Sequence, residues 1–331
     1  MTAGNMTGAY DLLQGWYRER GGKPPCPTRK DLDMIRRNFM TLYQKEAPSE
    51  EPLPVHVQPA SIEDTVPDAA TILIAVKQMQ CGKSPGPSGI RVRDILFWEH
   101  NRPEIWNEFV LMVQDCFEGK PLPQEFSYSI LCLIPKAERG KMRGIVLLEV
   151  CYKVISTIIL MRIESGIKWH PGIHGFIHKR GTGTCILEAK LRMQLASYLC
   201  QPLFQIFLDL SKAYDNLDHE HIMSLMEAYG IGPHTRSISN ALWEHELMVP
   251  KSGDCFGIPL HPTRGVRQGD VISPLLFNIA VDAVLREWHV QVTTAHLTGL
   301  SAFFYADNGR IDGNDSDNVQ EALNIMTKLF L

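Results

Sequence analysis

The sequence lacks several features that would assign it to a familiar class. It contains no run of 18 apolar residues, which excludes a membrane-spanning helix. Its first twenty residues contain no apolar stretch of the kind that a secretory signal requires, so we expect a protein that is not secreted. The eight cysteines include no C-x-x-C pair, and the two closest are 15 positions apart. This spacing is typical of neither a zinc site nor a disulfide framework, and it predicts an intracellular protein of a reducing compartment, the cytoplasm or nucleus.

Net charge is also small. The 33 basic and 37 acidic side chains give −4, which excludes a uniformly basic nucleic-acid-binding surface. The charges are nevertheless unevenly distributed, because residues 135–193 hold 11 basic and 4 acidic side chains whereas residues 194–331 hold 8 and 16. A basic block before an acidic one is compatible with a phosphate-binding surface and a metal-binding region. Solvated faces of a globular protein are the commoner origin of such blocks.

The length and the distribution of prolines suggest how the chain is divided. At about 150 residues per domain, 331 residues correspond to about two domains, and 44% apolar residues permit a normal core. We expect a helical extension over 1–46, a proline-rich linker over 47–66, and two further parts over 67–200 and 201–331.

Local patterns predict the order of elements, above all after residue 200. Apolar periodicity, capping residues and turn residues give the following expectations: a helix near 68–80, a strand over Ser129–Pro135, a helix from Gly181 to about Leu199, a buried strand over Leu203–Leu208, a helix from an N-cap at Asp218 to Tyr229, a hairpin over Glu246–Leu260 turning at Ser252-Gly253, a helix with Ser273 as N-cap, and a strand over Leu300–Tyr305 followed by a turn at Asn308-Gly309. We therefore predict an α+β fold with a split βαβ (ferredoxin-like) antiparallel sheet and helices on one face.

Two aspartates occupy positions that suit metal chemistry. Asp209 follows a strand, and Asp307 is expected at the tip of a hairpin. Mg²⁺ prefers oxygen ligands and is commonly held by one or two carboxylates together with substrate phosphates. An aspartate after a strand is more often a turn or cap residue, so neither position alone decides the matter.

The residues around these aspartates resemble the motifs of reverse transcriptases. The matching segments are Lys83–Ile90 (KSPGPSGI), Ile134–Lys136 (IPK) with Arg143–Ile145 (RGI), Gly175-Phe176 with Arg180–Thr182, Phe207–Asp215 (FLDLSKAYD), Arg264–Phe277 (RGVRQGDVISPLLF) and Phe303–Asn308 (FFYADN). Each segment is moderately specific, but together they occur in the family's order over about residues 67–331. The variety is most similar to non-LTR retrotransposon and group II intron-like enzymes.

The resemblance implies a fold, a reaction and a set of ligands. The fold would be the fingers (67–200) and palm (201–331) of a right-hand polymerase. The reaction would be RNA-templated DNA synthesis by two-metal nucleotidyl transfer, with two Mg²⁺ ions or Mn²⁺, dNTPs, and an RNA template carrying a DNA primer. No membrane is implied.

The resemblance also assigns roles to single residues. Asp209, Asp307 and Asn308 would be the catalytic positions, and Asp209, Asp307 and Leu210 the metal-binding ones. Nucleotide binding would fall to five further positions: Lys136, Arg143, Tyr214, Gln268 and Gly269. Lys136 and Arg143 would hold the triphosphate, and Tyr214 would stack under the sugar and exclude a 2′-hydroxyl. Gln268 and Gly269 would shape the nucleotide and template pocket. Ordinary surface charge, a core aromatic and a tight turn before the next helix are the corresponding alternatives.

Some positions depart from the family pattern. Asn308 replaces the second aspartate of the Tyr-Ala-Asp-Asp box, which removes a negative charge where two dications would bind. Ser88 replaces the usual aspartate and Gly144 the usual proline. The amphipathic segment from Val319 to Phe330 is followed by no recognisable thumb, so we expect a chain truncated before the thumb, with this or other domains supplied elsewhere.

Three other interpretations remain. The chain would be a catalytically inactive retroelement remnant that binds nucleic acid or protein if Asn308 abolishes turnover. An RNA-templated RNA polymerase is disfavoured by Tyr214 and by the Tyr305-Ala306-Asp307 sequence. His170, His174 and His178 are spaced as ligands on a helix would be, but the intervening Pro171, Gly172 and Gly175 disfavour a regular helix and therefore zinc.

Overall fold

The computed structural model describes residues 54–57, 59–135, 142–252 and 255–330, together with seven positions near the N-terminus: Leu32, Arg36, Arg37, Phe39, Met40, Leu42 and Tyr43. The chain forms two compact units. Unit 1 comprises 1–46, 64–161 and 233–271, and unit 2 comprises 47–63, 162–232 and 272–331. The units interleave along the sequence, so neither coincides with the segments 67–200 and 201–331, and the assignment of fingers and palm to those segments stays a prediction. The helices expected within 1–46 fall largely outside the described residues.

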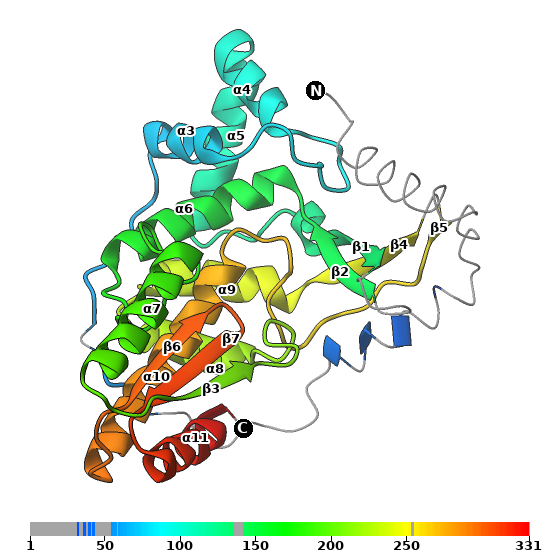
Figure 1. The fold of residues 1–331 in the computed structure, drawn as a ribbon. Helices are drawn as coiled ribbons and strands as arrows, with labels where there is room; N and C mark the ends of the chain where they lie inside the picture. Colours follow the sequence, from blue (N-terminus) through cyan, green and yellow to red (C-terminus); the bar gives the residue numbers. More distant parts are fainter. Residues whose placement is uncertain are drawn as a thin grey trace. The chain divides into compact units, whose positions relative to one another are not determined.

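Unit 1 combines helices with a four-stranded sheet (Figure 1). Its elements are α3 (Ala69–Gln78), α4 (Val92–Asn101), α5 (Pro103–Phe117), the 3₁₀ helix η1 (Gln124–Ser127), β1 (Tyr128–Pro135), β2 (Met142–Leu147), α9 (Pro233–Glu244), β4 (Leu247–Ser252), β5 (Cys255–Phe256) and the larger part of α6 (Val150–Gly166). The expected helix near 68–80 is confirmed as α3, where the Asp68 side chain accepts a hydrogen bond from the Thr71 N–H at 2.7 Å.

The sheet of unit 1 has the strand order β2-β1-β4-β5. Strand β1 pairs antiparallel with β2 and parallel with β4, which lies more than one hundred residues further along the chain. The hairpin expected over Glu246–Leu260 is confirmed, because β4 and β5 pair antiparallel and Ser252 lies opposite Cys255. The core beneath the sheet is aliphatic and aromatic, and among its fully buried members are Val113, Phe117, Leu131, Tyr152 and Ile155.

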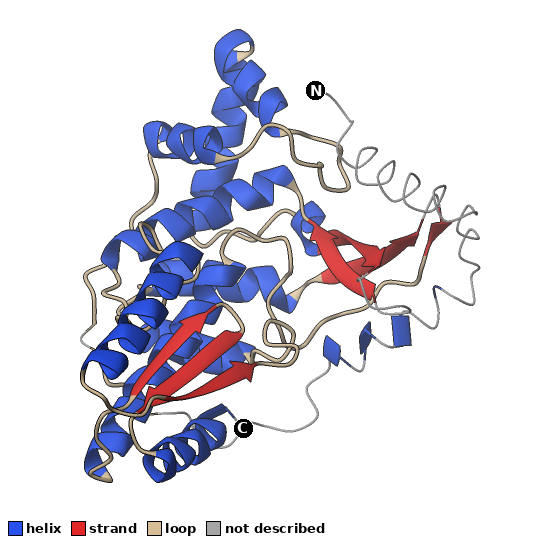
Figure 2. Cartoon of the chain, viewed as in Figure 1, coloured by secondary structure: helices blue, strands red, loops and turns tan. Residues whose placement is uncertain are grey.

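Unit 2 is built on a second, three-stranded sheet. Its elements are α7 (Thr182–Tyr198), β3 (Phe204–Asp209), α8 (His219–Ala228), α10 (Ser273–Thr294), β6 (Ser301–Tyr305), β7 (Asn308–Gly313) and α11 (Ser316–Phe330). The strand order is β3-β7-β6, and both pairings are antiparallel, so β3 and β6 run parallel on either side of β7 (Figure 2). This is the split arrangement that the order of elements predicts.

Strand β3 corrects one expectation. The apolar run ending at Leu208 predicts a buried strand, but β3 is an edge strand of its sheet, and the Phe207 and Phe204 side chains are 76% and 40% exposed. An apolar run does not reveal whether neighbours cover both faces of a strand, because that depends on elements that are distant in sequence.

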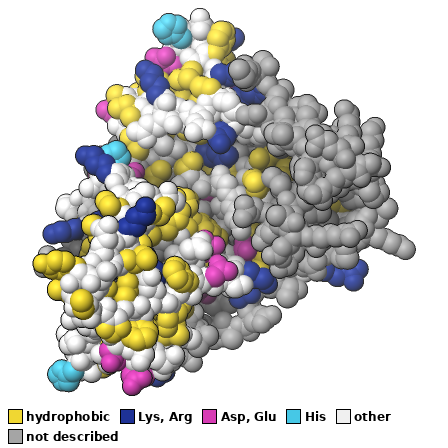
Figure 3. Space-filling view, viewed as in Figure 1, with side chains coloured by type: hydrophobic (Ala, Val, Ile, Leu, Met, Phe, Trp, Pro, Cys, Tyr) yellow, Lys and Arg dark blue, Asp and Glu magenta, His cyan; other side chains and the backbone are white. Residues whose placement is uncertain are grey.

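The helices of unit 2 contact both faces of this sheet, which corrects the expectation that they lie on one face. Phe303 and Phe304 are consecutive in β6, so their side chains point to opposite faces. The Arg192 guanidinium of α7 lies 4.8 Å from the centroid of the Phe303 ring, whereas Phe330 of α11 contacts Phe304 with ring centroids 5.6 Å apart. None of the residues of α7 is buried, and the contacts of this helix with the sheet include the ion pair between Arg192 and Asp312 at 3.7 Å. In Figure 3 hydrophobic side chains gather over the part of the surface where α7 lies.

Helix starts in unit 2 agree with the capping patterns in one case and differ in another. Asp218 caps α8 as expected, and its carboxylate accepts from the His221 N–H at 3.0 Å. Ser273, expected as the N-cap of α10, is instead the first helical residue, because the cap position is taken by Ile272. Among the described residues, no helix is both long and apolar enough to cross a bilayer.

Candidate active site

Asp209 and Asp307 come from adjacent backbone segments at one end of the sheet of unit 2. Asp209 is the last residue of β3 and lies opposite Asn308, the first residue of β7. The Leu210 N–H donates to the Asp307 carbonyl at 2.9 Å, which joins the residue after Asp209 to the hairpin turn. Asp209 is exposed and Asp307 half-buried. Two of the predicted carboxylates are therefore brought together on an accessible edge, with the Leu210 backbone between them.

The turn that carries Asp307 differs from the expected one. The two turn residues are Ala306 and Asp307, with Ala306 in the left-handed region at φ 54°, and Asn308 pairs with Tyr305 to close the hairpin. The expected turn at Asn308-Gly309 is therefore wrong. Gly309 is needed for packing, because a Cβ there would lie 2.5 Å from the Phe304 ring.

Asn308 interacts directly with the neighbouring carboxylate. Its Nδ2 donates to Asp307 Oδ1 at 3.1 Å, and the side chain is exposed. An amide in this place offers one carbonyl oxygen as a ligand where an aspartate would offer a second charge. Compared with an aspartate at this position, Asn308 therefore leaves one negative charge fewer at this end of the sheet. Its N–H also occupies a lone pair of the Asp307 carboxylate.

The segment at His174 and Gly175 packs against the backbone of the hairpin that carries Asp307. The His174 N–H donates to the Phe304 carbonyl at 2.8 Å, and Gly175 lies so close that a Cβ there would be 2.7 Å from the Ala306 nitrogen. The Asn278 side chain of α10 donates to the Gly175 carbonyl at 2.8 Å. The sequence motif gave no role to Gly175 or Asn278. The close backbone approach explains why this position holds a glycine.

Tyr214 lies within electrostatic reach of the same carboxylate. Its ring stacks on Phe277 with centroids 5.0 Å apart and an interplanar angle of 18°. Burial, together with the negative charge of Asp307, raises the pKa of the Tyr214 hydroxyl to about 12. The hydroxyl therefore stays protonated at neutral pH, and a ring held by Phe277 lies within the electrostatic reach of Asp307. The core-aromatic and site interpretations of Tyr214 are thus compatible.

Gln268 and Gly269 belong to unit 1, where they form a tight turn against β2. The Val146 N–H donates to the Gln268 carbonyl at 2.8 Å. Gly269 has φ 136°, and a Cβ at this position would collide with the Val146 carbonyl oxygen. The expected tight turn before the Ser273 helix is therefore present.

The residues that flank this turn form a buried charged network that the sequence did not reveal. Arg267 pairs with Glu246 at 2.7 Å, and each side chain is 2% exposed. Asp270 accepts a hydrogen bond from the Tyr152 hydroxyl at 2.6 Å, and the Arg267 guanidinium lies 4.9 Å from the Tyr152 ring centroid. Burial raises the pKa of Glu246, although the Arg267 guanidinium opposes that rise. No local pattern connects Tyr152 with Asp270, because they are 118 positions apart.

The two residues predicted to hold the triphosphate are Lys136 and Arg143. Lys136 lies outside the described residues. Arg143 is in β2 opposite Ile134, and its side chain also lies outside what is described. The roles expected for both stay predictions.

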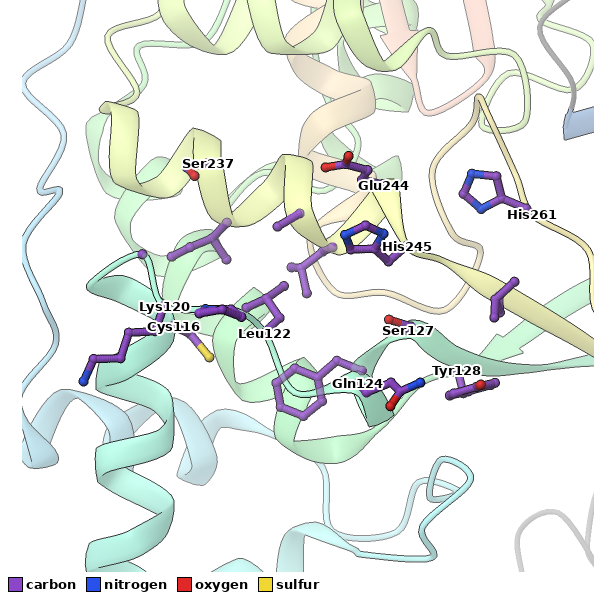
Figure 4. A pocket seen from close by; sticks show the side chains of 17 residues that line it. Cys116, Lys120, Leu122, Gln124, Ser127, Tyr128, Ser237, Glu244, His245 and His261 are labelled. Carbon is purple, nitrogen blue, oxygen red and sulfur yellow. The ribbon is translucent and has the colours of Figure 1, made fainter.

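One cavity in unit 1 contains none of the predicted site residues. It has a volume of about 720 Å³ and lies between the end of α5, η1 and α9 (Figure 4). Cys116, Lys120, His245 and His261 are among its polar lining residues. The Lys120 ammonium is already paired with Asp115 at 2.6 Å, so it is not a free cation for an anionic ligand.

The donor set at the end of the unit 2 sheet suits a hard divalent cation. It consists of the Asp209 and Asp307 carboxylates with the Asn308 amide and neighbouring carbonyl groups, all of them oxygen ligands of the kind that Mg²⁺ prefers. Across the described ranges, no group of three or more His, Cys, Asp or Glu side chains could hold a metal. Two carboxylates agree with the usual coordination of Mg²⁺ in proteins, where substrate phosphates and water supply the remaining ligands.

Comparison with known proteins identifies the family. Residues 134–330 match the family described as reverse transcriptase (RNA-dependent DNA polymerase). The chain is 26% identical over 231 residues to the retrovirus-related Pol polyprotein from type-2 retrotransposable element R2DM of Drosophila melanogaster, covering 64% of this chain and 20% of that protein. It is 27% identical over 216 residues to the corresponding type-1 element R2 polyprotein of Nasonia vitripennis, covering 61% and 20%.

Two further likenesses are more distant or more partial. The transposon TX1 uncharacterized 149 kDa protein of Xenopus laevis is 25% identical over 218 residues, covering 64% of this chain and 16% of that protein. Among solved structures, apo telomerase from Candida tropicalis truncated from the C-terminal domain aligns with a TM-score of 0.48 at 12% identity, covering 68% of this chain and 51% of that one. The chain spans about a fifth or less of the length of these retrotransposon relatives. The match over residues 134–330 includes both site aspartates and shows that this chain belongs to the reverse transcriptase family.

Proposed function

We propose that this chain carries out RNA-templated DNA synthesis, adding dNTPs to the 3′-hydroxyl of a DNA primer by two-metal nucleotidyl transfer at Asp209 and Asp307. The observation that carries the proposal is the junction of the two aspartates, formed by the pairing of Asp209 with Asn308 and by the hydrogen bond between Leu210 and Asp307. In this proposal the sheet of unit 2 is the palm, and unit 1 supplies the fingers.

The chain's own residues would position the reactants. Asp209, Asp307 and Leu210 would hold two Mg²⁺ ions, or Mn²⁺, and the bound ions would supply electrostatic stabilisation of the attacking and leaving oxygens. Tyr214 would lie under the sugar of the incoming nucleotide and exclude a 2′-hydroxyl, because its ring is fixed by stacking on Phe277. Catalysis of phosphoryl transfer depends largely on such positioning and on charge stabilisation.

The remaining roles lie in unit 1. Lys136 and Arg143 would hold the triphosphate of the dNTP. Gln268 and Gly269 would shape the pocket for the nucleotide and template. Their support is the match to the family motifs, together with the rigid turn in which Gln268 is bonded to Val146.

We further propose that Asn308 weakens catalysis. Its amide bonds to Asp307 and contributes no charge, so two dications would be held by two carboxylates rather than three. This observation also favours a second candidate function, a catalytically inactive remnant that binds nucleic acid or protein. The two candidates differ in whether restoring the charge restores turnover.

Primer extension on an RNA template separates them. We would measure dNTP incorporation with Mg²⁺ and with Mn²⁺ for the unmodified chain, Asn308→Asp, Asp209→Ala, and Asp317→Asn, an exposed acid in the first turn of α11 that serves as a matched charge control. We expect weak extension that Asn308→Asp raises by roughly 100- to 1,000-fold, the effect that one preorganised electrostatic group typically has on a transition state, and no change in the control.

Two outcomes would contradict the proposal. If Asp209→Ala leaves the observed extension unchanged, the metal-site assignment is wrong. If the unmodified chain and Asn308→Asp are both inert while RNA still binds in a salt-sensitive manner, the binding function replaces the catalytic one.

A further inference from the structure

A short segment packs along β6, the strand that leads into the turn carrying Asp307, and we name its residues 170–175 the strap. The Phe304 N–H donates to the Gly172 carbonyl at 2.8 Å, and the His174 N–H donates to the Phe304 carbonyl at 2.8 Å. These two hydrogen bonds pair the strap with the side of β6 that does not face β7. The strap therefore adjoins the backbone that presents Asp307.

The turn beside the strap has a strained backbone conformation. Ala306 has φ 54°, in the left-handed region that residues with a Cβ rarely adopt. Two more residues of this kind, Phe176 with φ 55° and Lys179 with φ 62°, follow the strap, and the Phe176 ring stacks on Tyr305 with centroids 6.4 Å apart. Such conformations persist only where the surrounding structure determines them, and they cluster at functional sites. The turn therefore depends on what packs against it.

Arg180 holds the strap through backbone carbonyl groups. Its Nη1 donates to the His170 carbonyl at 2.8 Å and to the Ile173 carbonyl at 2.7 Å, with a weaker contact to the Pro171 carbonyl at 3.4 Å. The side chain is half-buried, and no carboxylate forms an ion pair with it among the described residues. A hydrogen bond from an ionised donor is roughly twice as strong as a neutral one. The guanidinium charge therefore acts on the strap backbone.

Two buried side chains of α10 hold the ends of the strap. The Asp282 carboxylate accepts from the His170 N–H at 2.6 Å, and the Asn278 amide donates to the Gly175 carbonyl at 2.8 Å. These contacts leave the middle of the strap, where it pairs with β6, to Arg180. The path from the guanidinium to the turn is thus one of consecutive backbone hydrogen bonds.

We propose that Arg180 is a positioning residue for nucleotidyl transfer, and that it acts through the strap to hold the turn that brings Asp307 to Asp209. The inference rests on the proposed function, which assigns the metal ions to these two aspartates. No hydrogen bond or ion pair joins Arg180 to either aspartate within the described ranges, so its effect passes through the backbone of the strap.

Two variants separate geometry from charge. Arg180→Ala removes the hydrogen bonds and the charge, whereas Arg180→Lys keeps the charge but replaces the planar guanidinium by an ammonium group, which does not reproduce its geometry. Lys179→Gln is the matched control, because it removes a positive charge from the adjacent exposed side chain. All three would be made in the Asn308→Asp background, for which the proposed function expects the stronger extension.

Two measurements report on the turn independently. Steady-state primer extension with Mg²⁺ gives kcat and the KM for dNTP. Hydrogen exchange followed by mass spectrometry gives the protection of the amides in β6 and in β3, which lies at the other edge of the sheet, and it requires no catalysis.

We expect Arg180→Ala to lower kcat by about 100-fold at an unchanged KM, the loss that a displacement of about 1 Å causes at a reacting centre. Arg180→Lys should lie between Arg180→Ala and the background. In both variants the amides of β6 should exchange faster while those of β3 keep their protection. Lys179→Gln should match the background in every measurement.

Different results overturn the proposal in different ways. An unchanged kcat with full β6 protection in Arg180→Ala shows that the strap holds without Arg180. A raised KM at constant kcat makes Arg180 a contact to the nucleotide, and full activity in Arg180→Lys makes its charge sufficient. Faster exchange in β3 and β6 alike, with kcat lost only in proportion to unfolding, makes Arg180 a stabilising residue alone.

Failure of the proposed function has its own signature. A background chain that extends no primer overturns that function. Faster β6 exchange in Arg180→Ala would then show that the strap contact exists without the reaction, whereas unchanged exchange would overturn both.

Discussion

The buried pair of Arg267 and Glu246 provides the strongest stability prediction, because both members are nearly inaccessible to water. Arg267 Nε lies 2.7 Å from Glu246 Oε2, and each side chain is 2% exposed. The guanidinium also donates to the Leu242 carbonyl at 2.6 Å and lies over the Tyr152 ring. Replacement of Glu246 by Gln keeps the size and an acceptor oxygen but leaves the Arg267 charge without its partner.

The magnitude follows from the cost of an uncompensated buried charge. Removal of one partner of such a pair costs about 3–5 kcal/mol of unfolding free energy. With a urea m-value of about 3 kcal/mol/M, the upper end of the usual range because m increases with chain length, the unfolding midpoint should fall by roughly 1–2 M. Simultaneous replacement of both residues, Glu246→Leu with Arg267→Met, should cost much less than the sum of the single changes, because it removes both desolvated charges.

Urea unfolding monitored by circular dichroism is the assay. Asp115→Asn is the control, because its ion pair with Lys120 joins side chains that are 45% and 54% exposed. Such a surface pair contributes about 0–1 kcal/mol, so the midpoint should hardly move. A loss below about 1 kcal/mol for Glu246→Gln, or strict additivity in the double variant, would refute the argument from burial.

Three further predictions concern residues of unit 2. Gly175→Ala places a Cβ against the Ala306 nitrogen and should cost about 1–3 kcal/mol in urea unfolding as well as most primer extension. Gly183→Ala, a helical position with open space around it, should lose neither stability nor extension, and equal losses in the two variants would contradict the close approach. Burial lowers the pKa of the His170 ring from 6.5 to about 4, so the unfolded chain takes up the proton first as pH falls, and stability should decline from pH 6.5 to 4. His170→Gln should flatten the dependence of the urea midpoint over that window, and an unchanged slope would show that His170 is not the titrating group. Tyr214→Val should relax discrimination against ribonucleotides in primer extension, measured as the ratio of kcat/KM for dNTP and rNTP; an unchanged ratio means that another residue excludes the 2′-hydroxyl.

The end of the unit 2 sheet that carries Asp209 and Asp307 is the part of the fold that the sequence predicts best. Asp209 was expected after a strand and Asp307 at a hairpin tip, and both expectations rest on short-range patterns of apolar and turn residues. The helix capped by Asp218 and the β4–β5 hairpin were predicted for the same reason. In each case, the residues that determine the structure are close neighbours along the chain.

The misassigned turn shows where local patterns fail. Asn308-Gly309 is a favourable turn sequence taken alone, yet both residues lie in β7. Strand β7 pairs with β6 on one side and with β3 on the other. In this register Asn308 is a strand residue that lies opposite Asp209. The ring of Phe304 then occupies the space that a side chain at Gly309 would need. Pairing on two sides thus overrides the preference of a dipeptide.

By itself the sequence determined the family, the order of most elements, and the chain positions of the two aspartates. Motifs, caps and apolar periodicity each depend on residues that are close together along the chain, so they can be recognised without the tertiary structure. Only the tertiary structure decided that β3 is an exposed edge, that β1 runs parallel to a strand more than one hundred residues away, and that Tyr152 meets Asp270. It also decided that the segment at Gly172 and His174 pairs with β6. These features depend on contacts between distant segments, and their energies come from burial and charge pairing that no local pattern contains.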